Sequence, residues 1–309
     1  MAKDETKRTK IGGQALFEGL MMKGPDKTCT AVRKPDGEIF LEVTPTLANP
    51  VGKFLFVRGI VSMIQNFKEG YERISRSAEI ALPEDEQPES KFDQWIEKHT
   101  GPRFYRIFSI AAMVVGLVLG VVLFMLVPIW LVNGIEMIPG VQLGIFRATA
   151  EGLIKIAVFL AYLLAVTRIK DIHRVFEYHG AEHKTITCYE QGDELTIENI
   201  RRHSRFHPRC GTSFIFIVLI VSILIFSFVS WGNPLLRMCI KILLLPLVVG
   251  ISYEIIMYAS MHRNLFCRIL SAPGLWVQRL TTFEPDDDQI EVALTAFQAV
   301  LPDDGRDLL

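Results

Sequence analysis

Histidine and cysteine side chains, which supply the nitrogen and sulfur ligands of many metal ions, gather in one part of this sequence. Four of the chain's seven histidines and two of its five cysteines lie between residues 179 and 210. His179 and His183 are four residues apart, so on a helix their rings project from one face about one turn apart. Two imidazoles in that arrangement can chelate a borderline metal such as Zn²⁺. The spacing therefore predicts a metal site.

Glu182 stands beside the second histidine and completes the pattern His-x-x-Glu-His. In inverted zinc peptidases with this pattern, the glutamate is the general base for metal-bound water. Glu182 is accordingly predicted to be a catalytic base. Two other interpretations of the histidines stay open, because they could instead contact anionic headgroups or serve as hydrogen-bonded groups of a small domain. The pattern implies no kinship with those peptidases, whose soluble fold does not fit the spans described below.

A third ligand must come from another part of the chain. His207 and Cys210, spaced His-x-x-Cys, are the first candidates, with Cys188 and Glu190 behind them. Such nitrogen, sulfur and oxygen donors suit a divalent ion, zinc first among them. A zinc-type ligand set is therefore expected around the two histidines.

Glu254 is a further candidate ligand. It lies a short way inside an apolar segment, and an ionisable group at membrane depth marks a functional site by default. Two alternatives stay open for this side chain, which could reach the membrane interface or pair with Arg263.

Apolar blocks are predicted to hold this segment at a membrane. Half of the 309 residues are hydrophobic, and the mean hydropathy of +0.29 exceeds what the polar surface of a soluble domain allows. The excess collects in four predicted transmembrane helices. In the second, Glu151 and Lys155 are spaced for an ion pair. The four spans are residues 107–132, 148–167, 212–231 and 235–259.

The basic residues indicate how these spans are oriented. Eight Lys and Arg residues lie between the second and third spans, whereas the alternate loops hold Arg147 in one case and Arg237 with Lys241 in the other. Cytoplasmic loops carry the excess of Lys and Arg. The pattern predicts a multi-pass protein of the cell membrane with both termini and the central segment in the cytoplasm.

The segments outside the spans predict a small domain. Residues 28–43 are typical of a β-hairpin around a Pro-Asp-Gly turn. Residues 51–82 have a helical apolar period, which fits either an interfacial helix or a packed one. A last helix starts after Pro285 and carries an apolar stripe to Val300. We therefore expect a mainly α, polytopic membrane protein with a small α+β cytoplasmic module built from both termini and the central segment. Its predicted parts are residues 1–82, an acidic linker at 83–90, helix pairs at 107–167 and 212–259, the central segment 168–211 and C-terminal helices at 260–309.

Charge and cysteine content exclude other classes. The formal net charge is −1, which gives no indication of nucleic-acid binding. The five cysteines form no Cys-x-x-Cys pair and no disulfide framework, which favours a reducing compartment. Cys29, Cys239 and Cys267 are interpreted as packing residues.

Four blocks of sequence resemble the YqhQ-like family of bacterial polytopic membrane proteins. The blocks are residues 12–25, 178–185, 207–212 and 273–282, which follow in order over nearly the whole chain. The second reads Tyr-His-Gly-Ala-Glu-His-Lys-Thr and the third His-Pro-Arg-Cys-Gly-Thr. The family carries a domain of unknown function, and its members are often labelled predicted metal-dependent enzymes. That label rests on the same His, Glu and Cys residues, so the resemblance implies the family and leaves the reaction open.

Two functions fit these observations. The first is a zinc-dependent hydrolase at the cytoplasmic membrane face, acting on a peptide or lipid, with His179 and His183 as ligands and His207, Cys210 or Glu254 completing the site. The second is a non-catalytic, metal-stapled scaffold or assembly factor for membrane proteins. A transporter is the weakest choice, because no pair of broken helices recurs in two halves. Three ligands and an open position favour catalysis, whereas a closed set of four favours a staple.

Overall fold

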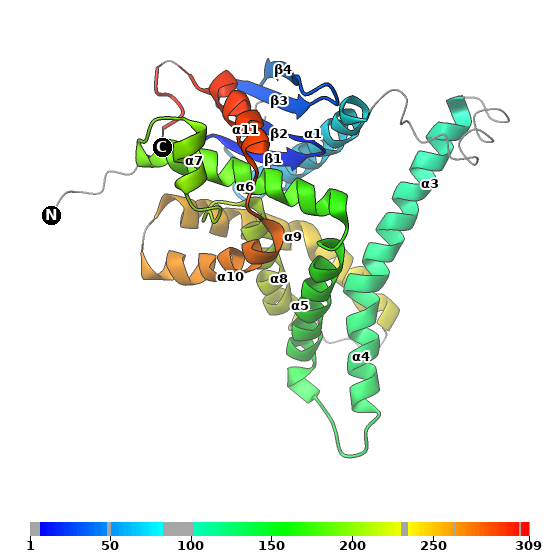
Figure 1. Cartoon of the computed structure of the whole chain (residues 1–309). Coiled ribbons are helices and arrows are strands. Elements are labelled where there is room, and N and C mark those ends of the chain that lie inside the picture. The colour runs from blue at the N-terminus through cyan, green and yellow to red at the C-terminus, as the bar shows by residue number, and fades with distance from the viewer. Residues whose placement is uncertain are drawn as a thin grey trace. The chain divides into compact units, whose positions relative to one another are not determined.

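The computed structural model describes residues 7–47, 51–82, 102–229, 234–262, 264–302 and 304–308. Helices form most of this structure, and four strands form its sheet (Figure 1). The chain divides into two compact units. The first consists of Met1–Leu82, Leu163–Val218 and Pro246–Leu309, and the second of Pro83–Tyr162 and Leu219–Leu245. The predicted acidic linker at 83–90 lies outside the described residues.

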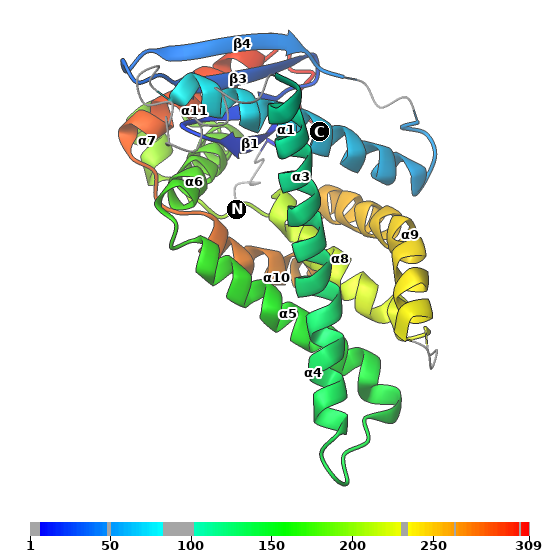
Figure 2. The same cartoon turned by 90° about the vertical axis from the view of Figure 1, so that its right-hand side faces the viewer.

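The sheet of the first unit is an antiparallel meander in the order β1-β2-β3-β4. The predicted hairpin at 28–43 is confirmed, because Cys29 pairs with Val43 and Gly37 takes a φ of 87° in the turn. The hairpin that precedes it was not expected from the sequence. The strands lie side by side in both views (Figure 1, Figure 2). They are β1 (Gly12–Leu16), β2 (Gly19–Lys23), β3 (Lys27–Arg33) and β4 (Ile39–Pro45).

Helices of the central and C-terminal segments cover the apolar face of this sheet. The central segment forms α6 (Lys170–Gln191) and α7 (Ile197–Arg202), and the last helix is α11 (Asp287–Val300). Figure 1 shows α11 in front of the strands and α6 below them. Asp286 caps α11, accepting the backbone N–H of Gln289, whose side chain bonds back to the cap. The helix predicted to start after Pro285 is confirmed.

One apolar core joins these elements. Leu20, Met22 and Cys29 of the sheet pack with Tyr178 of α6 and Phe297 of α11, and all five side chains are buried. Sheet and helices thus bury together the apolar surface that each would expose alone. The predicted association of the hairpin, the central segment and the last helix is confirmed.

Two further helices belong to the first unit. α1 (Val57–Ala81) follows the sheet in sequence and contacts β1 and β3, while α10 (Leu265–Thr281) precedes the loop to α11. Asn264 caps α10 by accepting the backbone N–H of Cys267. The helix expected within residues 51–82 is therefore present.

Long apolar helices also lie among the described residues. Three stretches of the described residues are long and apolar enough to cross a membrane, namely Met113–Glu136, Arg147–Val166 and Leu236–Ala259. They belong to α3 (Pro102–Val121), the π-helical turn η2 (Val122–Leu126), α4 (Val127–Glu136), α5 (Arg147–Val166) and α9 (Pro234–Met261), and the short 3₁₀ helix η3 (Gly144–Phe146) precedes α5.

The number of predicted spans needs a correction. The segment 212–231, expected to be the third span, corresponds to α8 (Gly211–Phe226), an apolar helix of 16 residues. At 1.5 Å per residue it is roughly 24 Å long, which is short of a hydrocarbon core of roughly 30 Å. Residues 230–233, at the end of that predicted span, lie outside the described residues. Three spanning-length helices are thus found where four were expected.

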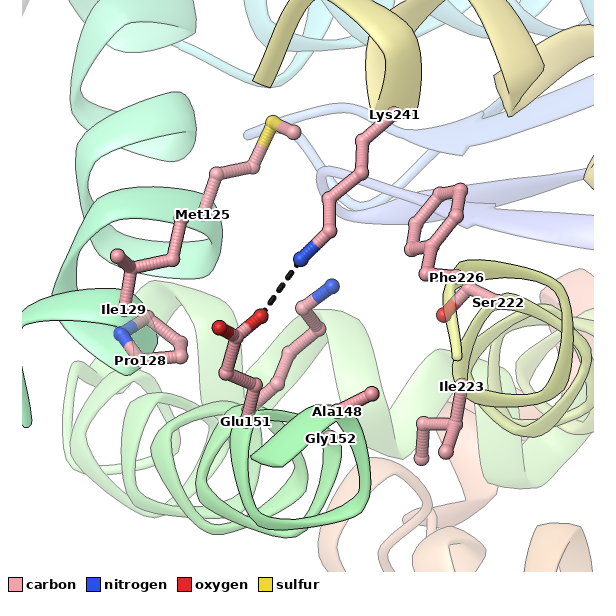
Figure 3. Close-up of a pocket in the computed structure, with 11 residues that line it drawn as sticks. Met125, Pro128, Ile129, Ala148, Glu151, Gly152, Ser222, Ile223, Phe226 and Lys241 are labelled. Carbon is pink, nitrogen blue, oxygen red and sulfur yellow. Dashed lines mark hydrogen bonds and ion pairs between the residues drawn. The ribbon is translucent and has the colours of Figure 1, made fainter. Parts of the chain in front are cut away.

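A buried carboxylate joins the helices of the second unit. Glu151 of α5 is 6% exposed and accepts hydrogen bonds from Lys241 at 2.6 Å and Arg237 at 3.1 Å, both on α9. Figure 3 shows the Lys241 ammonium pointing at the carboxylate. The pair expected between Glu151 and Lys155 is replaced by these contacts, and the Lys155 ammonium lies 5.5 Å from the ring centroid of Phe226. Glu151 also lies 3.4 Å from Arg147, four residues earlier on α5, so its partners come from both helices, and sequence spacing does not reveal those on α9.

We expect Glu151→Gln to destabilise the protein strongly. The change removes the carboxylate that the buried ammonium of Lys241 contacts at 2.6 Å, and breaking a buried ion pair costs about 3–5 kcal/mol. A cost of that size lowers the melting temperature by about 10 °C in a protein of this size. Thermal unfolding of the purified protein in detergent is the measurement. Glu136→Gln is the control, because this carboxylate shares the partner Arg147 with Glu151 but is more exposed. Equal melting temperatures for the two variants would contradict the prediction.

Candidate metal centre

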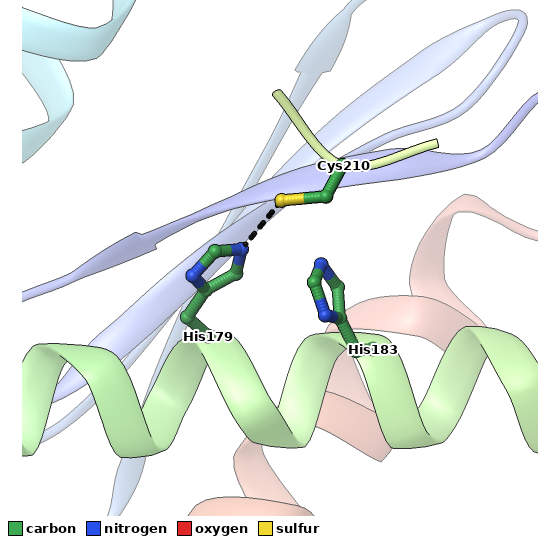
Figure 4. Close-up of side chains that lie close together, drawn as sticks. All are labelled: His179, His183 and Cys210. Atoms are coloured by element: carbon green, nitrogen blue, oxygen red, sulfur yellow. Dashed lines mark hydrogen bonds between the residues drawn. The ribbon is translucent and has the colours of Figure 1, made fainter. Parts of the chain in front are cut away.

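Three side chains from two segments bring their donor atoms together. His179 and His183 stand one turn apart on α6, and Cys210 immediately precedes α8. One ligand atom from each lies within 4.8 Å of the others. Figure 4 shows both rings rising from α6 toward the cysteine sulfur. The group can hold a metal ion.

Backbone carbonyls fix the tautomer and the orientation of the two imidazoles. Nδ1 of His179 lies 2.8 Å from the carbonyl oxygen of Thr281, and Nδ1 of His183 lies 2.6 Å from that of Arg205. A carbonyl only accepts, so each Nδ1 carries the proton and each Nε2 keeps its lone pair. Metal-binding histidines are held in this way in many proteins. Nε2 of His179 lies 3.1 Å from Sγ of Cys210, at the centre of the group.

The position of Cys210 suits a sulfur ligand. Its Sγ accepts the backbone N–H of Thr212 at 3.4 Å and lies 3.2 Å from the hydroxyl of the same residue. The N-terminal end of α8 adds the partial positive charge of a helix dipole. A sulfur that carries negative charge as a metal ligand is stabilised by both features.

Burial favours the ligand form of His183. The ring is 1% exposed, and desolvation lowers the pKa of this histidine against the opposing effect of Cys210. The imidazole is therefore neutral near neutral pH, and a neutral imidazole is the form that binds a metal.

Glu182 is buried beside the group. Its Oε1 accepts the backbone N–H of Gly13 at 2.8 Å, while its Oε2 has no hydrogen-bond partner among the described residues. Burial raises the pKa of Glu182, and the neighbouring His179 and the Gly13 N–H oppose the rise only in part. Buried carboxylate oxygens are normally hydrogen-bonded or bound to ions, so the free Oε2 fits a site that receives a further molecule.

His207 lies next to the three donors, but its ring contacts Glu190. Its ring centroid is 5.7 Å from that of His183, and its Nε2 is 3.4 Å from a carboxylate oxygen of Glu190. Burial raises the pKa of Glu190, but the contacts with His207 and Arg209 outweigh it and hold the pKa below its usual value. Gln278 fixes the backbone of His207 through its N–H and its carbonyl, at 2.9 and 2.8 Å.

The structure places the remaining predicted ligands elsewhere. Cys188 packs in a small apolar cluster with Ile200 and Ile290. Glu254 accepts a hydrogen bond from Nε of Arg58 at 2.8 Å, so its carboxylate has a cationic partner outside the group. The alternative partner expected for it, Arg263, lies outside the described residues. Of the predicted donors, the structure brings together His179, His183 and Cys210.

Several residues that position the site were not singled out from the sequence. The carbonyls of Thr281 and Arg205 hold the rings, Gln278 holds the loop, and Gly13 bonds Glu182. A Cβ on Gly13 would lie 2.5 Å from a backbone oxygen and 3.0 Å from the Glu182 side chain, so a glycine is needed there. Backbone donors and acceptors carry no signature in residue type, which is why the motifs alone did not indicate them.

Comparison with known proteins places the chain in a family. Residues 54–303 match the family described as "Protein of unknown function (DUF1385)". The chain belongs to this family. It is also 35% identical over 295 residues to the uncharacterized protein YqhQ of Bacillus subtilis (strain 168), covering 94% of this chain and 92% of that protein. No solved structure matches the chain. The resemblance to the YqhQ-like family is confirmed, and neither description states an activity.

The four blocks behind that resemblance meet at the candidate metal centre. The block at 178–185 supplies the two histidines and Glu182, and the block at 207–212 supplies the cysteine. The block at 12–25 supplies the N–H that bonds Glu182, and the block at 273–282 supplies the carbonyl that holds His179. Segments far apart in this DUF1385 chain thus share one place in the fold.

Proposed function

We propose that this protein is a membrane-embedded, metal-dependent hydrolase whose metal is held by His179, His183 and Cys210. The observation that carries the proposal is the convergence of these three donors, with both Nδ1 atoms held by backbone carbonyls. Two nitrogen ligands and one sulfur ligand suit zinc better than magnesium or calcium, which prefer oxygen. Zinc is therefore the proposed ion.

The proposed chemistry assigns a different part to each residue. A divalent ion with three protein ligands keeps a position for water and lowers the pKa of that water toward neutrality. Glu182 is the proposed general base, with Oε2 as the atom that takes the proton. The Gly13 N–H holds the other oxygen, so the carboxylate has one anchored and one available atom.

A closed scaffold site is the second candidate. His207 is near enough to become a fourth ligand if its ring leaves Glu190. The observation that favours this function is the network around Glu190, which accepts the backbone N–H of Thr9 at 2.8 Å and pairs with Arg209. Thr9 in turn bonds Asp307 near the other end of the chain. A metal closed by His207 would staple both ends of the chain to the central segment.

The membrane part of the proposal rests on the three spanning-length helices and on the Lys and Arg residues of the central segment. Both termini and the metal centre are proposed to lie on the cytoplasmic side of the cell membrane. A site at that face suits a peptide or lipid presented by the bilayer, or a membrane protein in the scaffold case. Nucleic acid is not a proposed partner.

Metal analysis of the purified full chain tests the site. We expect about one divalent ion per chain, predominantly zinc, because a donor group of this kind binds a single ion. The measurement is inductively coupled plasma mass spectrometry, on the protein as isolated and again after a chelator and added zinc. Protein that is folded, metal-free and unable to take up zinc would rule out both the hydrolase and the scaffold.

A further inference from the structure

Helix α1 contacts the rest of its unit through its smallest side chains. Gly59, Gly70 and Ser77 are its buried residues. A Cβ on Gly59 would lie 2.5 Å from the Tyr253 side chain of α9, and one on Gly70 would lie 2.8 Å from the amide of Gln14. The helix therefore approaches its neighbours closely along a row without bulky groups.

The contact between α1 and the sheet is polar. Arg73 donates hydrogen bonds to Thr30 at 2.7 Å and Thr44 at 2.8 Å, and Lys23 pairs with Glu69 at 2.9 Å. This face of the sheet carries threonines, whereas its other face carries the apolar core under α6 and α11. α1 therefore places no large apolar side chain in a core.

The large apolar residues of α1 point away from the unit. Phe67 is 72% exposed and Tyr71 61% exposed, and Ile64 and Ile74 are exposed as well. These residues follow one another at intervals of three and four, which is one stripe of a helix. An amphipathic helix of a soluble domain packs its apolar stripe against the core. In α1 the apolar stripe instead faces away from the rest of the unit. An exposed apolar stripe of this length indicates a surface that is covered by something else.

The start of α1 contacts a helix of spanning length. The residues before α1, Phe54 to Phe56, are exposed, and Phe56 lines an apolar hollow of about 260 Å³ with Ile251 and Ile255 of α9. Arg58 of α1 pairs with Glu254, which precedes the end of the apolar stretch Leu236–Ala259 by five residues. At 1.5 Å per residue, the start of α1 is thus joined to α9 roughly 8 Å from the end of that stretch, near headgroup depth.

Helix α10, which follows α9 in the chain, also indicates that the membrane surface lies near the end of α9. Its residues Leu265, Ile269 and Trp276 are exposed and recur at spacings of four and seven, so they too form one stripe. Tryptophan and tyrosine are typical of the interface between hydrocarbon and water. Both helices that adjoin the end of α9 therefore expose apolar residues.

We infer that α1 is an interfacial membrane helix, with the stripe of Ile64, Phe67, Tyr71 and Ile74 immersed in the lipid of the leaflet that borders the metal centre's unit. This inference rests on the membrane part of the proposed function. The contact of Phe56 and Arg58, at the start of α1, with the end of the apolar stretch of α9 favours lipid over a second copy of the chain. Lys53 and Lys68, both exposed, would contact anionic headgroups. Since α1 contacts the sheet through its polar side, immersion would fix the sheet and the metal centre at the bilayer surface.

Spin-label accessibility on the full chain tests this inference. Cys239, which is exposed, is first replaced by serine. A nitroxide is then attached to Phe67→Cys or Tyr71→Cys in vesicles of phosphatidylethanolamine and phosphatidylglycerol. Glu72→Cys, exposed on another side of α1, is the matched control, and Leu117→Cys in α3 is the lipid reference. Collision with oxygen reports lipid, and collision with a water-soluble nickel chelate reports water.

We expect labels at Phe67 and Tyr71 to favour oxygen as strongly as the label at Leu117, and several-fold more than the label at Glu72. A lipid signal at Leu117 with a water signal at Phe67 and Tyr71 would overturn the inference and leave the membrane proposal standing. A water signal at Leu117 as well would overturn both the inference about α1 and the membrane part of the proposed function. Dipolar coupling between labels on two chains would assign the stripe to a second copy and also overturn the inference. A circular dichroism spectrum equal to that of the unlabelled protein shows that the fold of each labelled protein is intact.

Discussion

Alanine at either position 179 or 183 should abolish stable metal binding. Each imidazole supplies one of three donors, and a backbone carbonyl already holds it in the ligand orientation. Changing only a residue that orients a metal ligand typically weakens affinity about 10- to 100-fold, so loss of the ligand itself should exceed that range. We therefore expect His179→Ala and His183→Ala to be purified with little metal, measured by mass spectrometry beside the wild type.

His203→Ala is the matched control for these variants. His203 belongs to the same segment, but its Nε2 lies 2.9 Å from Asp193 and it is not part of the group of three donors. Its removal should leave the metal content unchanged. Because metal binding also contributes folding energy, the two ligand variants should be cleaved faster between α7 and α8 in limited proteolysis. Wild-type metal content in both His179→Ala and His183→Ala would show that the group is not a metal site.

The histidine pair could be predicted because its geometry is local. Spacing of four residues on a helix fixes the relation between His179 and His183 whatever the rest of the chain does. Cys210 was one of several candidates, since a partner from another segment depends on the fold. Glu254 shows the limit of such reasoning, because its place inside an apolar segment suggested a ligand while the structure pairs it with Arg58, 196 residues away in sequence.

The two hairpins also differ in whether local sequence or contacts with other segments determine them. The hairpin at 28–43 has a Pro-Asp-Gly turn, and residue type alone predicts it. The turn between β1 and β2 places Glu18 at a φ of 46°, which is unusual for a residue other than glycine. Arg174 and Tyr178 of α6 hold the Glu18 carboxylate. A turn stabilised by contacts from another helix has no signal in its own sequence.

Apolar composition predicted the spanning segments better than it predicted their length and partners. Hydropathy located all four apolar helices, but the third ends at Phe226 as a helix of 16 residues. The pattern of residues 51–82 predicted an amphipathic helix without indicating which face would contact protein. That choice depends on Gly59, Gly70 and Ser77, small residues whose importance shows only when their neighbours are known.

Glu182→Gln should separate catalysis from metal binding. Glutamine keeps the size of the side chain and an oxygen that can accept the Gly13 N–H, but it cannot take a proton. Burial disfavours the charged carboxylate, so a neutral side chain should not destabilise the fold. Loss of a general base typically lowers a rate by about 10²- to 10⁴-fold. We expect normal metal content and failure to complement a strain that lacks the gene.

The three possible results for Glu182→Gln distinguish the two candidate functions. Glu177→Gln is the control on the same helix, since its side chain accepts a hydrogen bond from Gln289 and an amide oxygen can replace that acceptor. Retained metal with lost complementation supports a hydrolase, because the metal site is then intact and only proton transfer is missing. Reduced metal would instead mean that the carboxylate orients a ligand, as a scaffold allows. Full complementation would exclude the hydrolase, because a reaction that depends on Glu182 as its base cannot proceed at the wild-type rate without it.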